Sequence, residues 1–274
     1  MRHDTGSPDV ASLSSGMADG GLLSVVGIGP GDYPDLTHRA ADTLQRAERI
    51  VGYSLYTALV REWLPEAQYI ESPIGAESER CGAALDMAAG GLRVALVSSG
   101  DAGIYAMAGL VYELAWERGW RFDTPHRPHI EVIAGVTAAS AAAALVGAPL
   151  MSDFATISLS DLMTPWSVIE QRLRGAALGD FVVALYNPMS RKRHHQLPRA
   201  CEILLQQHNA ATPVAIVRQV CRPEQEARFT TLEQLAREQI DMLTLVIVGN
   251  SATRMLGGRM VTLRGYPTDH SGAQ

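Results

Sequence analysis

The feature that most constrains this chain is the alternation, along its first half, of short apolar runs with longer segments of helical periodicity. Strand-like runs occur at residues 22–28, 92–97 and 130–133, and helical patterns occur at residues 77–89 and 104–117. Because crossover helices join parallel strands, this order predicts an open sheet of parallel strands with helices on its faces.

The second half of the chain has a different rhythm. Strand-like runs at residues 154–159, 180–186, 214–220 and 243–248 have few helical segments between them. This spacing predicts a mixed sheet, and hence a second α/β domain. We place the boundary between Gly147 and Ser152. The expected organisation is an N-terminal α/β domain over residues 22–148, a C-terminal α/β domain over residues 149–267, and a tail over residues 268–274.

The first 21 residues are polar and rich in serine, glycine and aspartate. They lack the apolar stretch of a signal peptide, so we expect a disordered segment that precedes a cytoplasmic protein. The most apolar later stretch, residues 134–151, is mostly alanine and is interrupted by glycine and proline. A membrane span needs about 20 strongly apolar residues, so this stretch predicts a tightly packed buried helix and no membrane association.

Composition argues against two further classes of protein. The chain has 274 residues and a formal net charge of −6, whereas a general nucleic-acid binder shows a basic face. Its cysteines, Cys81, Cys201 and Cys221, are isolated from one another in sequence. That isolation is not typical of a disulfide framework or of a cysteine-held iron–sulfur cluster, and we expect no metal site.

The loop GIGPGD, residues 27–32, follows the first apolar run and resembles a phosphate-binding turn. A Walker loop would supply a lysine, which is missing here. A dinucleotide fingerprint would have a third glycine where Asp32 stands, and a carboxylate there would repel a pyrophosphate. The glycines therefore predict a tight turn or a close ligand, and not a phosphate site.

Asp32 has two readings. It stands where α/β sheets place their binding sites, at the carboxyl end of a strand. It is also near a helix start, although Asp35 and Thr37 are better placed to cap that helix. We favour a role for Asp32 in the site.

Three more loops follow apolar runs in the same way. They are SSGDAGIY at residues 98–105, GVTA at residues 135–138 and YNPM at residues 186–189. Aspartate, threonine, asparagine and a helix start can hydrogen-bond a ribose, an amino group or a base edge. Each loop alone is also ordinary turn chemistry. Together the four loops favour a ligand that contains a ribose and an amino acid but no phosphate.

These loops resemble the tetrapyrrole methyltransferases, which use S-adenosylmethionine (SAM), and the resemblance covers residues 22–265. GIGPGD is similar to the opening loop of that family, GDAGIY to its SAM loop and GVTA to its second SAM segment. The resemblance implies two α/β domains with SAM in a cleft between them, and a homodimer. The cofactor-binding residues that it implies are Pro30, Gly100, Asp101, Ile104, Thr137, Ala138 and Asn187.

Four blocks resemble one branch of this family, which methylates C17 of precorrin-3B in cobalamin biosynthesis. They are VGY at residues 51–53, SGDAGIYAMAGL at 99–110, LYNPMSRKR at 185–193 and VGNS at 248–251. The implied reaction couples this methylation to contraction of the macrocycle, giving precorrin-4. The alternatives are the cobalt-bearing substrate, cobalt-factor III, and another tetrapyrrole. The missing cysteine cluster slightly favours the metal-free substrate.

Methyl transfer needs positioning rather than a covalent nucleophile, and ring contraction also needs removal of a proton. We expect Asp32 to be the base or an orienting group, with His38 as the weaker candidate. The substrate carries many carboxylates, so we expect Arg191, Lys192 and Arg193 to bind them, with Arg218 and Arg222 as secondary candidates. A solvated helix start explains that basic run equally well. Tyr105 is expected at the substrate.

Two other functions remain open at this point. One is a nucleotide-dependent oxidoreductase, against which Asp32 argues through its charge. The other is a tetrapyrrole carrier or an inactive relative, which would bind the macrocycle without SAM. The intact segments at Gly100–Asp101 and Thr137–Ala138 argue against a carrier.

Overall fold

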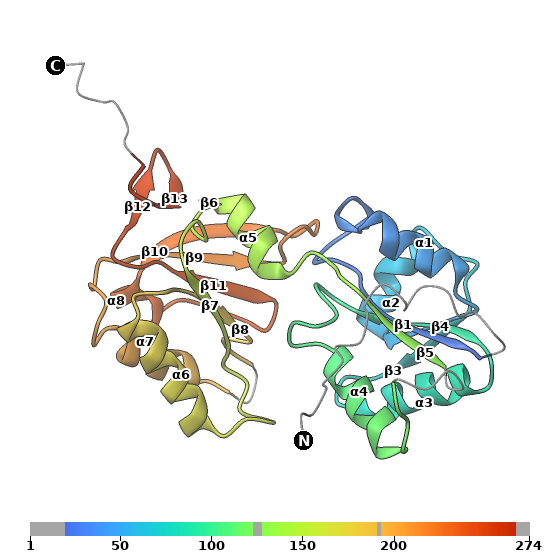
Figure 1. Cartoon of the computed structure of the whole chain (residues 1–274). Helices are drawn as coiled ribbons and strands as arrows, with labels where there is room; N and C mark the ends of the chain where they lie inside the picture. Colours follow the sequence, from blue (N-terminus) through green and yellow to red (C-terminus); the bar gives the residue numbers. More distant parts are fainter. Residues whose placement is uncertain (1–19, 123–127, 191–192, 267–274) are drawn as a thin grey trace, which may run out of the picture. The chain divides into compact units, whose positions relative to one another are not determined.

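The computed structural model describes residues 20–122, 128–190 and 193–266, which form two compact units (Figure 1). Unit 1 contains the described chain up to Ile28 together with Thr37–Gly135. Unit 2 contains Gly29–Leu36 and the chain from Val136 onward. The N-terminal segment that we expected to be disordered lies almost wholly outside the described residues, as does the tail.

Unit 1 is built on five parallel strands in the order β3-β2-β4-β1-β5. These strands are β1 (Leu22–Gly27), β2 (Arg49–Tyr53), β3 (Tyr69–Ser72), β4 (Arg93–Ser98) and β5 (His129–Ile133). The central strands β1 and β4 are buried almost throughout, because helices cover both faces of the sheet. The parallel sheet expected from the alternation of strands and helices is confirmed.

The helices of unit 1 are α1 (His38–Arg46), α2 (Ser54–Arg61), α3 (Glu77–Ala89) and α4 (Ala108–Glu117). Figure 1 shows α1 and α2 on one face of the sheet and α3 and α4 on the other. The chain therefore leaves the neighbouring strands β1 and β4 toward opposite faces. That arrangement is a topological switch point, where open α/β sheets bind their ligands.

The starts of two helices test predictions made from the sequence. Thr37 is the N-cap of α1, and its Oγ1 accepts a hydrogen bond from the backbone N–H of Ala40 at 3.2 Å, as expected. The helix expected from Ile104 is wrong in its first turn, because α4 begins only at Ala108. Tyr105 has a φ of 53°, a left-handed conformation that a right-handed helix does not contain.

Unit 2 contains a mixed five-stranded sheet in the order β10-β9-β11-β8-β7, in which only β7 and β8 are parallel neighbours. Its strands are β7 (Phe154–Ser158), β8 (Val182–Tyr186), β9 (Pro213–Arg218), β10 (Glu226–Thr231) and β11 (Thr244–Val248). Its helices are α5 (Ala138–Val146), α6 (Trp166–Leu178), α7 (Gln196–Leu204) and α8 (Leu232–Leu235), and a short 3-10 turn covers Tyr33–Asp35. The expected mixed sheet is confirmed.

Alternating side chains of this sheet enter two different cores. Val183 and Leu185 of β8 pack with α6 and α7, whereas Val182 and Ala184 pack with the alanines of α5. This is the period-two pattern of a strand that is buried on both faces. Tyr186, two residues beyond Ala184, therefore points to the α5 side as well.

The division between the units differs from the boundary expected between Gly147 and Ser152. Helix α5 belongs to unit 2, because Ala139, Ala142 and Val146 are buried in the core that also contains strands β8, β9 and β11. The boundary expected from the sequence placed this helix in the N-terminal domain. Where the chain divides into pieces that fold independently stays a prediction.

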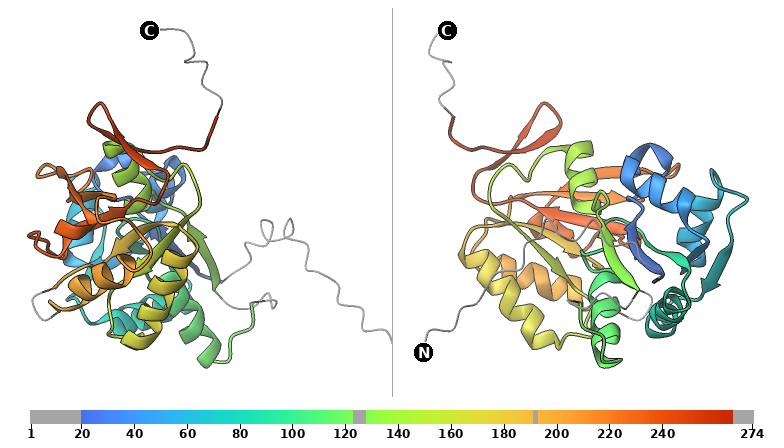
Figure 2. Two further views of the ribbon diagram at one scale, coloured as in Figure 1. Left: turned by 90° about the vertical axis from the view of Figure 1, so that its left-hand side faces the viewer. Right: turned by 45° about the vertical axis from the view of Figure 1, so that its right-hand side comes forward.

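A third, small sheet closes the described chain. It consists of β6 (Gly147–Ala148), β12 (Thr253–Leu256) and β13 (Arg259–Thr262) in the order β12-β13-β6. Figure 2 shows the β12–β13 hairpin projecting from the rest of unit 2. None of the helices in the described part of the chain is both long and apolar enough to cross a membrane.

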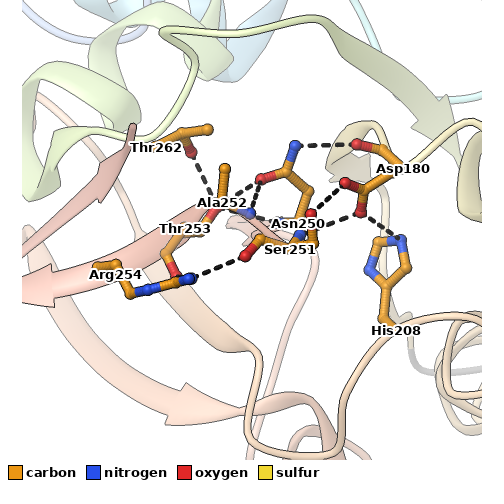
Figure 3. Close-up of polar contacts among 8 residues, drawn as sticks. All are labelled: Asp180, His208, Asn250, Ser251, Ala252, Thr253, Arg254 and Thr262. Carbon is orange, nitrogen blue, oxygen red and sulfur yellow. Dashed lines mark hydrogen bonds and ion pairs between the residues drawn. The ribbon is translucent and has the colours of Figure 1, made fainter. Parts of the chain in front are cut away.

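The VGNS block, residues 248–251, forms a polar network that ties this small sheet to the large one (Figure 3). Buried Asn250 donates from Nδ2 to the backbone oxygen of Asp180 at 2.9 Å, and Ser251 donates from Oγ to the Asp180 carboxylate at 2.5 Å. Thr253 contacts both Asn250 and Thr262 through its hydroxyl. Because β11 is antiparallel to β8, the network lies beside the start of β8, and the YNPM turn lies at the other end of that strand.

His208 lies beside this network with its side chain only 1% exposed. Its Nε2 is 4.0 Å from Oδ1 of Asp180, and neither ring nitrogen has a hydrogen bond of ordinary geometry within the described residues. Burial, partly opposed by the charge of Asp180, lowers the pKa of His208. The folded protein therefore holds this imidazole in its neutral form.

We expect this histidine to weaken the protein in acid. As the pH falls below about 6.5, the unfolded chain takes up a proton that the folded chain resists, so stability is lost. His208→Phe removes this penalty. Its unfolding free energy relative to wild type should rise as the pH falls from about 6.5 to about 5. Urea unfolding across that range measures it, and a constant difference would contradict the buried neutral imidazole.

Candidate functional site

Three loop glycines meet where β1, β4 and β5 end in unit 1. A Cβ added to Gly27 would lie 2.7 Å from the oxygen of Gly100 and 2.8 Å from the nitrogen of Gly135. A Cβ on Gly135 would lie 2.2 Å from the oxygen of Gly100. The backbones of all three loops therefore touch, and only glycine allows that approach. This contact explains Gly27 without any phosphate.

Asp101 locks the same three-loop crossing through its side chain. Its Oδ1 accepts a hydrogen bond from the N–H of Gly103 at 2.8 Å, and its Oδ2 accepts one from the N–H of Gly135 at 3.0 Å. The carboxylate is half-buried. Each oxygen keeps a lone pair after these two bonds, so Asp101 can still accept a hydrogen bond from a ligand.

The segment after Asp101 is a closed loop that ends where α4 begins. The N–H of Ala108 donates to the oxygen of Ala102 at 3.0 Å, which closes the loop, and Ile104 and Tyr105 at its tip are exposed. Buried Arg80 supports its far end, because its guanidinium donates to Ser72 Oγ at 2.7 Å and lies 4.0 Å from the Met107 sulfur. Ile104 and Tyr105, which we predicted to contact ligands, therefore lie on a loop that is anchored at both ends.

In unit 2, a tyrosine hydroxyl holds the start of α5. Tyr186 Oη lies 2.5 Å from Thr137 Oγ1 and accepts a hydrogen bond from the N–H of Ala139 at 3.0 Å. Thr137 is the N-cap residue of α5, and Ala138 is its first residue. Tyr186 therefore joins the end of β8 to the predicted second SAM segment. We did not predict this contact, although the alternation along β8 places Tyr186 on the α5 face.

Asn187 follows in a left-handed conformation, with a φ of 50°. Its Nδ2 donates to Ser158 Oγ at 3.0 Å, and its backbone oxygen accepts from Arg193 Nη1 at 3.2 Å. Arg193 Nη1 also donates to the oxygen of Leu159 at 3.1 Å. Arg193, which we expected to bind substrate carboxylates, is half-buried and braces two backbone carbonyls. Arg191 and Lys192 lie outside the described residues.

The remaining part of the GIGPGD loop belongs to unit 2 and is docked on the turn that follows β9. Pro30 accepts a hydrogen bond through its oxygen from Arg222 Nε at 2.9 Å. A Cβ on Gly31 would lie 1.8 Å from the oxygen of Cys221. Burial, a hydrogen bond to Asp35 and the charges of Asp35 and Asp32 raise the pKa of the Cys221 thiol to about 11. This thiol stays protonated, and Asp32 stands beside it on a fixed loop.

The secondary candidates have other roles. Arg222 positions Pro30, and Arg218 donates from Nε to Asp241 Oδ2 at 2.7 Å. His38 is the exposed first residue of α1.

A cavity of about 600 Å³ in unit 1, lined by Ser24, Arg39 and Glu131 among others, lies at the amino ends of the strands, away from these loops. Within residues 20–122, 128–190 and 193–266, no group of three or more potential ligand side chains is placed to hold a metal ion.

Comparison with known proteins identifies this arrangement. A model of the tetrapyrrole (corrin/porphyrin) methylases matches residues 22–236. A probable cobalt-factor III C(17)-methyltransferase of Salmonella typhimurium is 48% identical over 89% of this chain and 99% of its own length. A precorrin-3B C(17)-methyltransferase of Sinorhizobium sp. is 39% identical over 86% of this chain and 91% of its own length.

Solved structures agree with these sequence relatives. The crystal structure of the methyltransferase CobJ is similar with a TM-score of 0.82 and 39% identity, covering 89% of this chain and 100% of that one. A uroporphyrin-III C-methyl transferase of Thermus thermophilus, complexed with S-adenosyl homocysteine, has a TM-score of 0.65 at 21% identity. It covers 84% of this chain and 97% of that one, and it shows the shared fold.

The exposed groups of these loops fit the chemistry of SAM, which combines an ammonium group, a carboxylate, a ribose diol and a flat base. Asp101 offers an acceptor for the ammonium group or the diol, and exposed Ile104 offers apolar surface. Helix α5 begins at Ala138, and a helix start suits a carboxylate. The N–H groups of the next three residues bond Tyr186 and Thr137, so the N–H of Ala138 is the group proposed to donate to it. The donor and acceptor set contains no cation cluster for a polyphosphate within the described part of these loops.

The glycine crossing gives a direct test. We expect Gly135→Ala to lower the unfolding free energy by about 2–3 kcal/mol, because its Cβ would enter the space of the Gly100 carbonyl. Gly109→Ala in α4 is the matched control, since a Cβ there meets no atom within 4 Å. That change should be neutral or stabilising by up to about 1 kcal/mol. Equal melting temperatures for the two variants would contradict the close crossing.

Proposed function

The chain belongs to the tetrapyrrole (corrin/porphyrin) methylases, and from that premise we propose that it is a SAM-dependent methyltransferase that methylates C17 of a precorrin-3B-type tetrapyrrole with contraction of the ring. Methylases of this family use SAM as the methyl donor. The relatives named as C(17)-methyltransferases, at 39–48% identity, support the position of methylation. The observation that carries the proposal is the Asp101 carboxylate at the switch point of the unit 1 sheet.

When bound, SAM supplies an electrophilic methyl group, and we propose the loop residues that would hold it for each unit separately. In unit 1 they are Gly100, Asp101 and Ile104. In unit 2 they are Pro30, Thr137, Ala138 and Asn187. The bonds from Asp101 to two loops, from Tyr186 to Thr137 and from Asn187 to Ser158 support this assignment, because each holds its residue in one orientation. Fixed geometry is what a displacement at carbon requires.

The tetrapyrrole is proposed to meet Tyr105 and Asp32. Tyr105 is exposed in its strained conformation, and such residues gather at functional sites. Asp32 is half-buried on a loop that Arg222 and Cys221 hold in place. We propose that its carboxylate removes or orients the proton of the C20 hydroxyl during ring contraction. Arg191 and Lys192 remain candidates for the substrate carboxylates.

Two substrates fit this proposal. The Salmonella relative, at 48% identity, is named for cobalt-factor III, and the Sinorhizobium relative, at 39%, for precorrin-3B. The higher identity favours the cobalt-bearing substrate, whereas the cysteine content of the sequence leaned toward the metal-free one. We further propose that the protein works in the cytoplasm as a homodimer, by analogy with its family.

Titration calorimetry with S-adenosylhomocysteine tests the cofactor site. We expect one site per wild-type chain and a loss of at least about tenfold in affinity for Asp101→Ala, because a charge-assisted hydrogen bond is worth roughly 1.5–3 kcal/mol. Asp42→Ala, which removes an exposed carboxylate from α1, is the control and should bind as the wild type does.

Thermal melting of the same variants separates binding from folding. Asp101→Ala also breaks two backbone hydrogen bonds, so its melting temperature sets the range in which binding is measured on folded protein. Wild-type protein that binds NAD and not S-adenosylhomocysteine would replace the methyltransferase by the oxidoreductase. Undiminished affinity in folded Asp101→Ala would remove Asp101 from the site.

A further inference from the structure

The loop between β7 and α6 starts directly beside the proposed site in unit 2. Strands β7 and β8 are parallel, with Ser158 paired to Tyr186. The N–H of Leu159 donates to the oxygen of Tyr186 at 2.9 Å, and Ser158 Oγ accepts from Asn187. The loop therefore leaves the sheet at the edge where Tyr186 and Asn187 lie.

The tip of this loop carries two apolar side chains in solvent. Met163 is 95% exposed and Leu162 is 80% exposed, which are the largest values among the large hydrophobic residues of the described chain. Neither side chain supports the core of its unit. Scattered exposed apolar residues are ordinary, but two adjacent ones at a site edge present a small apolar surface.

Both ends of the loop are anchored, so the exposure of its tip is imposed by the fold. Gln196, itself 1% exposed, donates from Nε2 to Asp161 Oδ2 at 2.9 Å. Arg193 Nη1 donates to the oxygen of Leu159 at 3.1 Å. On the far side, Pro165 is the N-cap residue of α6, and Trp166 packs against the core. Only the short tip between these anchors faces outward.

We propose that Leu162 and Met163 form a substrate-contacting surface that packs against the apolar face of the tetrapyrrole macrocycle. The inference rests on the proposed function and names a contact for the ring itself, distinct from its carboxylates. A tetrapyrrole macrocycle presents a broad face with conjugated segments and carries charged groups at its rim. A thioether and a branched aliphatic chain suit such a face, because methionine makes favourable contacts with π systems and adapts to their shape.

The two side chains therefore act in substrate selection, and SAM binding does not depend on them. Of the residues proposed for SAM in this unit, Thr137 and Ala138 are held by Tyr186. Asn187 is held by Ser158, the last residue of β7, and not by the loop tip. Loss of the apolar tip should weaken the macrocycle alone. Loss of these two side chains should therefore change the KM for the tetrapyrrole and leave the KM for SAM unchanged.

Steady-state kinetics with the double variant Leu162→Ser/Met163→Ser tests the contact. With precorrin-3B or cobalt-factor III as substrate, we expect the KM for the tetrapyrrole to rise about tenfold or more. The KM for SAM, the affinity for S-adenosylhomocysteine and the melting temperature should not change. Leu178→Ser is the matched control, since Leu178 is 77% exposed at the other end of α6. It should behave as the wild type in every measurement.

Oxidation of Met163 by hydrogen peroxide, followed by peptide mass spectrometry, reports the contact without mutation. The tetrapyrrole should slow oxidation of Met163 and leave Met255, which is 40% exposed on β12, unaffected. S-adenosylhomocysteine alone should protect neither residue.

Three results would overturn the inference. One is an unchanged tetrapyrrole KM in the double variant of an active enzyme. Another is Met163 oxidation that the tetrapyrrole does not slow. The third is protection of Met163 that grows with protein concentration in the absence of tetrapyrrole, which would assign the tip to a contact between copies of the chain. Wild-type protein that neither binds S-adenosylhomocysteine nor turns over would instead remove the proposed function, and this contact with it.

Discussion

The candidate site depends on one carboxylate and the three backbones beside it. Asp101 accepts hydrogen bonds from Gly103 and Gly135, so a single side chain fixes both the loop after β4 and the loop after β5. That arrangement is possible only because Gly27 and Gly135 have no Cβ, which would otherwise clash with the carbonyl oxygen of Gly100. Replacing Asp101 therefore affects geometry as well as chemistry, and binding data on such variants need stability data beside them.

Similar close contacts explain why the GIGPGD loop is rich in glycine although it does not match a phosphate-binding motif. Gly27 serves the crossing in unit 1, while Gly29 and Gly31 let the chain turn and dock in unit 2. Gly29 has a φ of 75°, and Gly31 lies against the backbone of Cys221. Each glycine thus meets a steric demand of the protein itself. Asp32, whose charge is unfavourable for a pyrophosphate, is the last residue of this loop. The docking of Gly31 fixes the backbone that carries its carboxylate.

Much of the fold follows from the sequence, because apolar runs and helical periodicity decide local structure. The parallel sheet, the mixed sheet and the capping role of Thr37 were all predicted. Local patterns could not predict which segments far apart in the sequence pack against each other. The expected domain boundary placed the alanines of α5 in the N-terminal domain, yet their small size matches Ala184 and Ala215, with which they share the core of unit 2. Tyr105 read as helical because side-chain periodicity does not register a left-handed backbone.

For the candidate site, the sequence predicted which loops follow the strand ends more fully than it predicted the contacts of those loops. Glycines and aspartate at strand ends identified the loops, since the carboxyl ends of strands collect binding residues. The hydroxyl of Tyr186 escaped notice because its partner Ala139 lies 47 residues away in sequence. The contact of buried Arg80 with Met107, 27 residues away, escaped notice for the same reason. Arg193 was assigned by its charge alone, although its burial commits Nη1 to the backbone. The VGNS block marks the family branch, yet its described contacts are structural.

The most direct measurement of the central claim is the position of the transferred methyl group. The purified protein would be incubated with SAM labelled with ¹³C in its methyl group, and separately with precorrin-3B and with cobalt-factor III. The product would be analysed by mass spectrometry and ¹³C NMR. We expect a single labelled methyl group at C17 of a ring-contracted product from one of the two substrates. A label at another carbon, or methylation without contraction, would contradict the proposed function.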